Sequence, residues 1–238
     1  VRSDGDPYAK APAEFFGRDE TVPEPVAEAL DQINHPEVPT VYGPVAQLVF
    51  WLGSLVGPGR LWVLKLLMVA LELSGWWALS RVVGARVGVL LWWCPLAITE
   101  VAFAGHVDGV GVAGLAWAAA AWLRGDRIMT TAGAVWAMGV KFFGVIFLPF
   151  IFRRFGWRWA AAAGGLFALI HLPFLLQGSD AGWTGLSAMG TTFEYNSTGY
   201  AVLRWMLSAE VARFVALGII LTFAVAAWWR WSRDPDGI

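Results

Sequence analysis

Residues 61–79 read LWVLKLLMVALELSGWWAL, and this stretch indicates the fold class more clearly than any other. It holds only two charged side chains, Lys65 and Glu72, and its length is close to the roughly 20 apolar residues that an α-helix needs to cross a bilayer. The sequence therefore predicts an all-α, polytopic integral membrane protein. Further apolar runs predict more membrane helices, at 87–104, 110–123, 129–140, 142–152, 157–176 and 211–229.

The composition of the 238-residue chain supports this class. Apolar residues make up 58% and charged residues 15%, with 16 Trp and a mean hydropathy of +0.57, whereas an ordinary soluble domain has about 25% charged residues. This composition excludes intrinsic disorder and collagen. A disulfide scaffold is also excluded, because the lone Cys94 cannot close an intrachain disulfide. We expect membrane lipids as partners and no nucleic acid.

Charge is distributed unevenly along the chain. The first 42 residues hold nine acidic and three basic side chains, a local balance of −6 against −1 for the whole chain. Most other basic residues flank the apolar runs, which marks those gaps as cytoplasmic: Arg81, Arg86, Arg124, Arg127, Arg153, Arg154, Arg158, Arg230 and Arg233. This rule places the turn 105–108 outside. It also favours two half-spans that reverse at Lys141 over one tilted span, which stays an alternative.

The same topology places the ends of several helices on the external face. The run 44–56 is too short for a crossing and predicts a juxtamembrane helix. We expect an external segment over 1–60 and a bundle of about seven passes over 61–238, with an external loop at 177–204. Because the acidic start lies outside with no apolar helix before it, we expect at least one membrane helix upstream.

Ionisable residues near the predicted external ends are the candidates for chemistry. The segment EVAFAGHVDGVG at 100–111 sets Glu100, His106 and Asp108 among glycines; such a group could hold a metal, bind a sugar hydroxyl or act as a base. A turn with Asp108 as N-cap is the plainer alternative. Lys141 could neutralise phosphate or extend to lipid headgroups. Lys65 and Glu72, seven residues apart on one helix face, could pair with each other or with neighbours.

Several motifs resemble one family. The segment INHPEVPTVYGPVAQ at 33–47 resembles the NHP-x-x-PT-x-Y-P-P-x-A-Q pattern of bacterial GT-C superfamily glycosyltransferases, which use polyprenyl-phosphate sugars. Three later elements are similar to the family's W-N-P-L … E … G-H-x-D, K … L-P and aromatic-x-x-Asn patterns: Trp93-Cys-Pro-Leu96 with Glu100 and Gly105-His-Val-Asp108, Lys141 with Leu148-Pro149, and Phe193-Glu-Tyr-Asn196. Gly43 and Cys94 depart from the usual Pro and Asn. The family's usual catalytic acidic residue lies beside a first helix that precedes these elements.

The resemblance implies a glycosyltransferase of the bacterial plasma membrane with an outward-facing active site. It would transfer a sugar, most often mannose in this family, from a polyprenyl-phosphate donor to an envelope glycan or lipid acceptor. We expect no tightly bound cofactor, although Asp108 and His106 could hold Mg²⁺ or Mn²⁺. The resemblance implies that Asp108 and His106 are catalytic. It implies that the substrate and its phosphate are bound by Lys141, His35, Tyr42, Glu100 and Asn196.

Two other functions remain open. Half-helices broken at Lys141 also suit a transporter or flippase of lipid-linked sugar, although no inverted repeat is visible along the chain. A truncated, non-catalytic remnant is the second alternative, because the family's usual catalytic residue has no counterpart among the motifs.

Overall fold

The computed structural model describes residues 8, 10–15, 33, 35–176, 183–192 and 198–233. Throughout these ranges the regular structure is helical, and they contain no strand, which confirms the all-α class for the described part of the chain. The chain divides into two compact units, residues 1–190 and 191–238. The predicted split into an external segment over 1–60 and a bundle over 61–238 concerns the membrane, and it stays a prediction.

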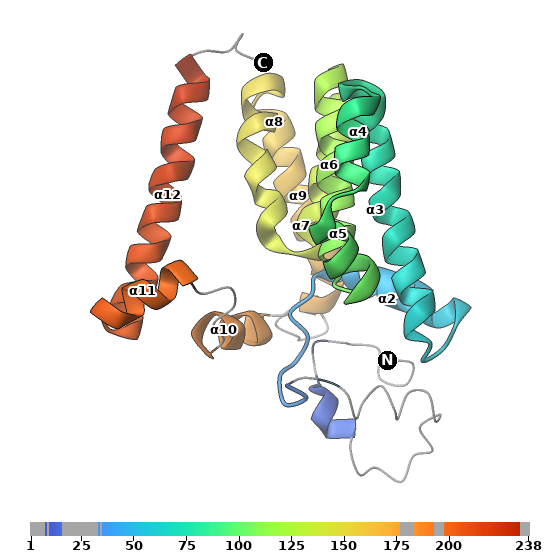
Figure 1. Ribbon diagram of the computed structural model, residues 1–238, viewed down its shortest axis with the longest axis vertical. Helices are drawn as coiled ribbons and strands as arrows, with labels where there is room; N and C mark the ends of the chain where they lie inside the picture. The colour runs from blue at the N-terminus through green and yellow to red at the C-terminus, as the bar shows by residue number, and fades with distance from the viewer. Residues whose placement is uncertain are drawn as a thin grey trace. The chain divides into compact units, whose positions relative to one another are not determined.

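A bundle of long helices forms the first unit (Figure 1). Small residues let its helices approach until their backbones touch: a Cβ on Gly75 of α3 would lie 2.7 Å from Ala113 Cα in α6, and one on Gly133 of α7 would lie 2.7 Å from the Gly114 carbonyl oxygen in α6. The α6 helix therefore lies between α3 and α7. The helices of this bundle are α3 (Leu61–Val83), α6 (Asp108–Arg124), α7 (Arg127–Val140), α8 (Leu148–Phe155) and α9 (Trp157–Leu176).

The predicted helix at 87–104 is interrupted. It consists of α4 (Ala85–Trp92), the short α5 (Pro95–Ala97) and the π-helical segment η2 (Ile98–Phe103). Proline disfavours the helical conformation in the residue before it, and Cys94 is accordingly extended. The π-helical segment carries Glu100, and the turn after it carries His106, to the end of the bundle. Single π-helical turns frequently occur at functional sites.

The chain reverses direction at Lys141. The α7 helix ends at Val140, the 3-10 segment η3 spans Phe142–Phe147, and α8 runs back alongside α7 (Figure 1). Ile151 of α8 packs with Ala134 and Met138 of α7 in one buried apolar cluster. The predicted break at Lys141 is therefore present, and one continuous helix across 127–155 is excluded.

The short helix α2 (Pro44–Val56) has the predicted bounds and lies across one end of the bundle (Figure 1). Its buried side chains Ala46 and Val49 pack with apolar residues from other elements: Met68 of α3, Val101 of η2, Val107 and Val110 at the start of α6, and Val140 of α7. This cluster fixes the segment before α2 against the ends of α6 and α7.

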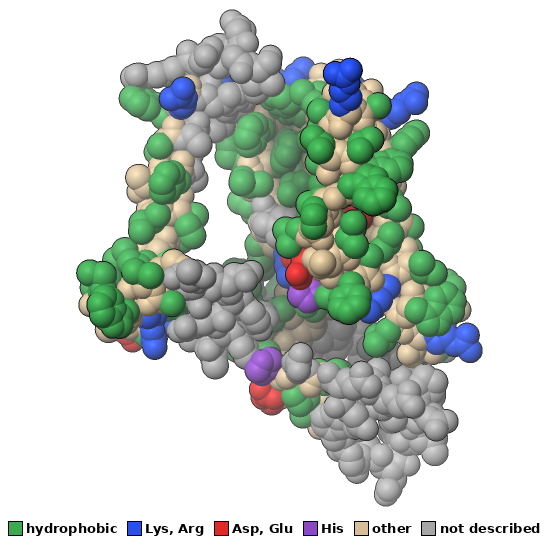
Figure 2. Space-filling model, in the orientation of Figure 1, with side chains coloured by type: hydrophobic (Ala, Val, Ile, Leu, Met, Phe, Trp, Pro, Cys, Tyr) green, Lys and Arg blue, Asp and Glu red, His purple; other side chains and the backbone are tan. Residues whose placement is uncertain are grey.

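Three helical stretches are long and apolar enough to cross a membrane: Leu61–Val83, Ala85–Phe103 and Trp157–Leu176. Large apolar side chains are exposed along them, among them Trp77, Leu90 and Leu169. Figure 2 shows such side chains over the visible face of the bundle. Extended exposed apolar surface is unusual for a soluble monomer.

Short helices occupy parts of the predicted 177–204 loop. The α10 helix spans Trp183–Thr192 and α11 spans Thr198–Met206. In the second unit α11 is followed by the long α12 (Ala209–Arg233), and the Tyr200 hydroxyl donates a hydrogen bond to the Ala209 carbonyl at 3.1 Å. This bond fixes the corner between the two helices. The first unit also contains a 3-10 turn, η1, at Pro12–Phe15.

Candidate functional site

An ion pair between Asp108 and Lys141 forms the centre of the candidate site. Lys141 Nζ lies 2.8 Å from Oδ1 and 2.9 Å from Oδ2 of Asp108. The lysine side chain is 33% exposed and the aspartate 41%, so the pair is open to solvent on one side. Asp108 is the first residue of α6 and Lys141 directly follows α7, where the helix dipoles favour an anion and a cation respectively.

The structure corrects the N-cap interpretation of Asp108. Val107 occupies the N-cap position of α6, and no side chain caps that helix end. The carboxylate is instead bound by the ammonium group from the neighbouring helix end.

Tyr42 covers Lys141 from the segment before α2. Lys141 Nζ lies 5.4 Å from the centroid of the Tyr42 ring, within the range of a cation–π contact. Hydrogen bonds on either side hold this tyrosine in place: the Gly43 N–H donates to the Val140 carbonyl at 2.9 Å, and Gln47 Nε2 donates to the Tyr42 carbonyl at 3.3 Å. The Tyr8 hydroxyl also donates to that carbonyl, at 2.9 Å.

A second polar pair lies just before Asp108 in the chain. His106 Nδ1 is 3.1 Å from Glu100 Oε2, and the His106 N–H donates to the Glu100 carbonyl at 2.8 Å. The side chains are 57% and 45% exposed. A carboxylate on Nδ1 orients an imidazole and leaves Nε2 able to exchange a proton with a substrate.

Lys65 has a role that sequence reasoning missed. Its ammonium donates to the Phe103 carbonyl at 2.6 Å, at the end of the π-helical segment. It does not pair with Glu72, which is buried within α3 at 6% exposure. Gly105 follows with φ of +80°, and a Cβ there would lie 3.0 Å from Lys65 Cε. Lys65 and Gly105 thus shape the turn that presents His106.

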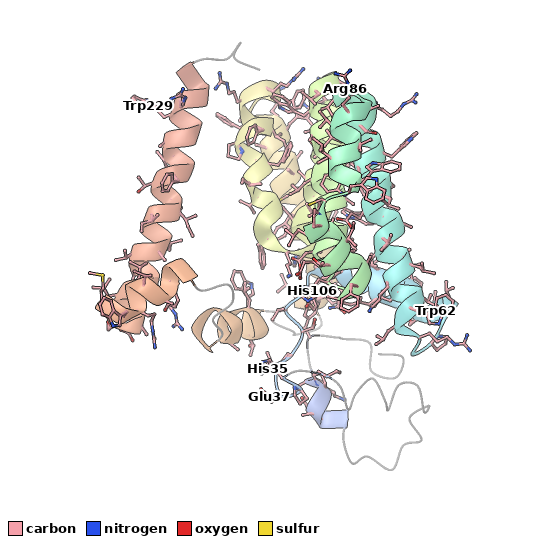
Figure 3. All side chains as sticks on the ribbon, in the orientation of Figure 1. His35, Glu37, Trp62, Arg86, His106 and Trp229 are labelled. Carbon is pink, nitrogen blue, oxygen red and sulfur yellow. The ribbon has the colours of Figure 1, made fainter. Side chains whose placement is uncertain are left out.

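The structure does not bring His35 into this group. His35 is paired with Glu37, Nδ1 to Oε1 at 3.5 Å. Figure 3 shows both side chains on the segment beyond the bundle end that carries His106. Asn196 lies outside the described residues.

The residues present do not fit a metal site. Within the described ranges, no three His, Cys, Asp or Glu side chains are grouped so that they could hold an ion. Both carboxylate oxygens of Asp108 contact Lys141, while His106 is engaged with Glu100. A cation would have to compete with the lysine ammonium, so we assign no step to Mg²⁺ or Mn²⁺.

An aromatic stack supports the residue that follows Lys141. The Phe142 ring stacks on His171, with centroids 6.4 Å apart, and on Trp183, at 5.8 Å. His171 is buried, and its Nδ1 lies 2.8 Å from the Phe167 carbonyl oxygen of the same helix. These contacts anchor the chain immediately after the reversal and so limit the positions that Lys141 can take.

No protein-family model, curated protein or solved structure matches this chain. The resemblance to GT-C glycosyltransferases therefore rests on the quoted motifs alone.

Proposed function

We propose that the chain is a polytopic membrane glycosyltransferase that uses a polyprenyl-phosphate sugar, with mannose as the first candidate. One observation carries the proposal: at one bundle end Lys141 contacts both Tyr42 and Asp108, although the three residues come from segments up to about 100 residues apart in the sequence. Each belongs to a different motif of the resemblance. His106, which is paired with Glu100, lies two residues before Asp108.

The proposed chemistry is a displacement at the anomeric carbon. The acceptor hydroxyl oxygen forms the new bond to that carbon, the bond between the carbon and the phosphate oxygen breaks, and the lipid phosphate leaves with the electron pair. Lys141, displaced in part from Asp108, stabilises the charge on the departing phosphate. His106 Nε2 takes the proton from the acceptor hydroxyl, with Glu100 stabilising the imidazolium.

The arrangement also supports a membrane orientation. Arg86 and His106 lie at opposite ends of the bundle (Figure 3). Under the positive-inside rule the arginine end faces the cytoplasm, so the candidate site faces outward. In a bacterium this places it on the outer face of the plasma membrane, beside envelope glycans and lipids that can act as acceptors.

The departure at Gly43 has a physical explanation within this proposal. A proline has no N–H, so it could not make the bond that Gly43 donates to Val140. A Cβ at this position would also meet the Gly139 carbonyl. Glycine at this position therefore allows the close approach that brings Tyr42 over Lys141.

A transfer assay tests the proposal. Membranes containing the chain receive a radiolabelled polyprenyl-phosphate mannose and an envelope lipid extract, and label in the acceptor is measured. We expect transfer that falls roughly tenfold or more in Asp108→Asn and in Lys141→Ala, while the control Arg81→Ala, at the other bundle end, keeps the wild-type rate. Unchanged rates in both site variants would remove these residues from catalysis. Movement of the labelled lipid across vesicles without transfer would favour the flippase.

A further inference from the structure

The bundle end opposite the candidate site carries a second concentration of charge. This is the end marked by Arg86 in Figure 3. The α6–α7 and α8–α9 turns meet there and hold five arginines with one acidic residue: Arg124, Asp126, Arg127, Arg153, Arg154 and Arg158. The site proposed above uses none of these residues.

Two of the arginines bridge the turns reciprocally. The Arg154 guanidinium carbon lies 4.6 Å from the centroid of the Trp122 ring in α6. The Arg127 guanidinium carbon lies 5.1 Å from that of the Trp159 ring in α9. An arginine of the α6–α7 pair therefore contacts a tryptophan of the α8–α9 pair, and an arginine of the α8–α9 pair contacts a tryptophan of the α6–α7 pair. Both contacts are within cation–π range. We call these four side chains the Arg–Trp bracket.

The neighbouring carboxylate does not neutralise the Arg–Trp bracket. Asp126 Oδ1 accepts hydrogen bonds from the N–H groups of Ile128 and Met129, both at 3.0 Å, and so caps α7. No ion pair joins a carboxylate to Arg127 or Arg154 in the part of the chain that the structure describes. The positive charge of the bracket is thus available to an outside anion.

The geometry suits a phosphate that carries acyl chains. Each guanidinium lies within cation–π distance of an indole, and its N–H donors have the planar arrangement that matches phosphate oxygens. Exposed apolar side chains flank the bracket on the same two turns: Ile128 at 63% exposure, Met129 at 53% and Trp157 at 66%. A free phosphate would leave that apolar surface unused, whereas the chains of a phospholipid would cover it.

We propose that the Arg–Trp bracket binds the headgroup of an anionic phospholipid in the cytoplasmic leaflet. The proposal needs a membrane but is independent of the glycosyltransferase proposal. It goes beyond the role of the arginines in orientation, because it requires a lipid at one defined place. Basic pockets between membrane helices on this side are suited to such headgroups.

A lipid titration tests the proposal. The full chain in neutral detergent is titrated with phosphatidylglycerol, and bound lipid is counted by native mass spectrometry. Phosphatidylcholine serves as the neutral comparison and excess inorganic phosphate as competitor. The test variant is Arg127→Gln/Arg154→Gln, and the matched control is Arg81→Gln/Arg86→Gln, which removes the same charge from the same end of the bundle.

We expect one phosphatidylglycerol to bind in preference to phosphatidylcholine and to resist inorganic phosphate. Affinity should fall at least about tenfold in the test variant, since each basic residue near an anionic lipid contributes roughly a fivefold factor, and should be retained in the control. Equal losses in the two variants, displacement of the lipid by phosphate, or no preference over phosphatidylcholine would each overturn the proposal.

A charge-preserving variant covers the case in which the glutamine pair does not fold. In Arg127→Lys/Arg154→Lys the charge remains, but the planar guanidinium donors are lost. We expect phosphatidylglycerol affinity to fall about threefold or more, since lysine cannot reproduce two parallel hydrogen bonds to phosphate. Wild-type affinity in this variant would show that charge alone attracts the lipid and would overturn the bracket as a site.

Discussion

Gly43 donates its backbone N–H to the carbonyl of Val140 at 2.9 Å, one residue before Lys141. This bond joins the segment before α2 to the end of α7 and, with the apolar cluster around α2, holds Tyr42 over the lysine. The candidate site therefore depends on a contact between two backbones, in addition to the charged side chains that mark it in the sequence.

Replacing Gly43 with alanine should loosen this junction. The added Cβ would meet the Gly139 carbonyl, and overpacking of this kind costs about 1–3 kcal/mol. We expect a lower midpoint of thermal unfolding, measured in detergent by circular dichroism. Gly165→Ala is the control, because a Cβ there meets nothing within 4 Å; a fall of equal size in that variant would argue against the junction.

The contact between α6 and α7 should be equally intolerant of added volume. A Cβ on Gly133 would lie 2.7 Å from both the Gly114 carbonyl oxygen and the Ala118 nitrogen, which are backbone atoms. We expect Gly133→Val to cost about 2 kcal/mol or more and to reduce the yield of monodisperse protein in size-exclusion chromatography. Gly164→Val, in open space on α9, should behave as wild type; if both variants elute alike, the helices do not pack as described.

The Asp108–Lys141 pair should show coupling in a double-mutant cycle. Asp108→Asn and Lys141→Met each leave the other group without its partner, so the double variant should lose less stability than the two single variants together. The coupling should stay below about 1 kcal/mol, because both side chains are partly exposed and solvent screens their attraction. Chemical unfolding in detergent measures it, and strictly additive losses would mean that the pair does not form.

The two ends of the bundle should label from opposite sides of the membrane. In a Cys94→Ser background, Ala104→Cys lies beside the candidate site and Arg86→Cys at the other end; both positions are exposed. We expect a membrane-impermeant maleimide added to intact cells to modify Ala104→Cys, and to modify Arg86→Cys only after the membrane is opened. The reverse pattern would place the candidate site in the cytoplasm and rule out an outward-facing transferase.

Much of the architecture follows from local signals in the sequence. The bounds of α2 are predicted by Pro44 and by the glycines after Val56, and the reversal at Lys141 by the arginines on either side of it. The motif residues Tyr42, Asp108 and Lys141 could be named from spacing and resemblance, although their mutual contact could not. Pro95 indicates a break between α4 and η2, but the continuous apolar run around it predicts one unbroken helix.

Other features depend on tertiary contacts that sequence spacing does not carry. The bond from Lys65 to the Phe103 carbonyl joins residues 38 apart, whereas helical spacing offered Glu72 or unnamed neighbours as its partner. The cross-pairing of Arg127 and Arg154 with tryptophans of other helices likewise requires the two turns to meet. Backbone donors such as Gly43 have no side chain to mark them.

Whether Lys141 holds the phosphate of a lipid-linked substrate can be measured by direct binding. A short-chain polyprenyl phosphate is titrated into the purified full chain and into Lys141→Ala, with Arg81→Ala as control, and binding is followed by microscale thermophoresis. We expect saturable binding to wild type and to the control, weakened about tenfold or more in Lys141→Ala because a charge-assisted contact to phosphate contributes about 1.5–3 kcal/mol. Equal affinity in all three proteins would contradict it.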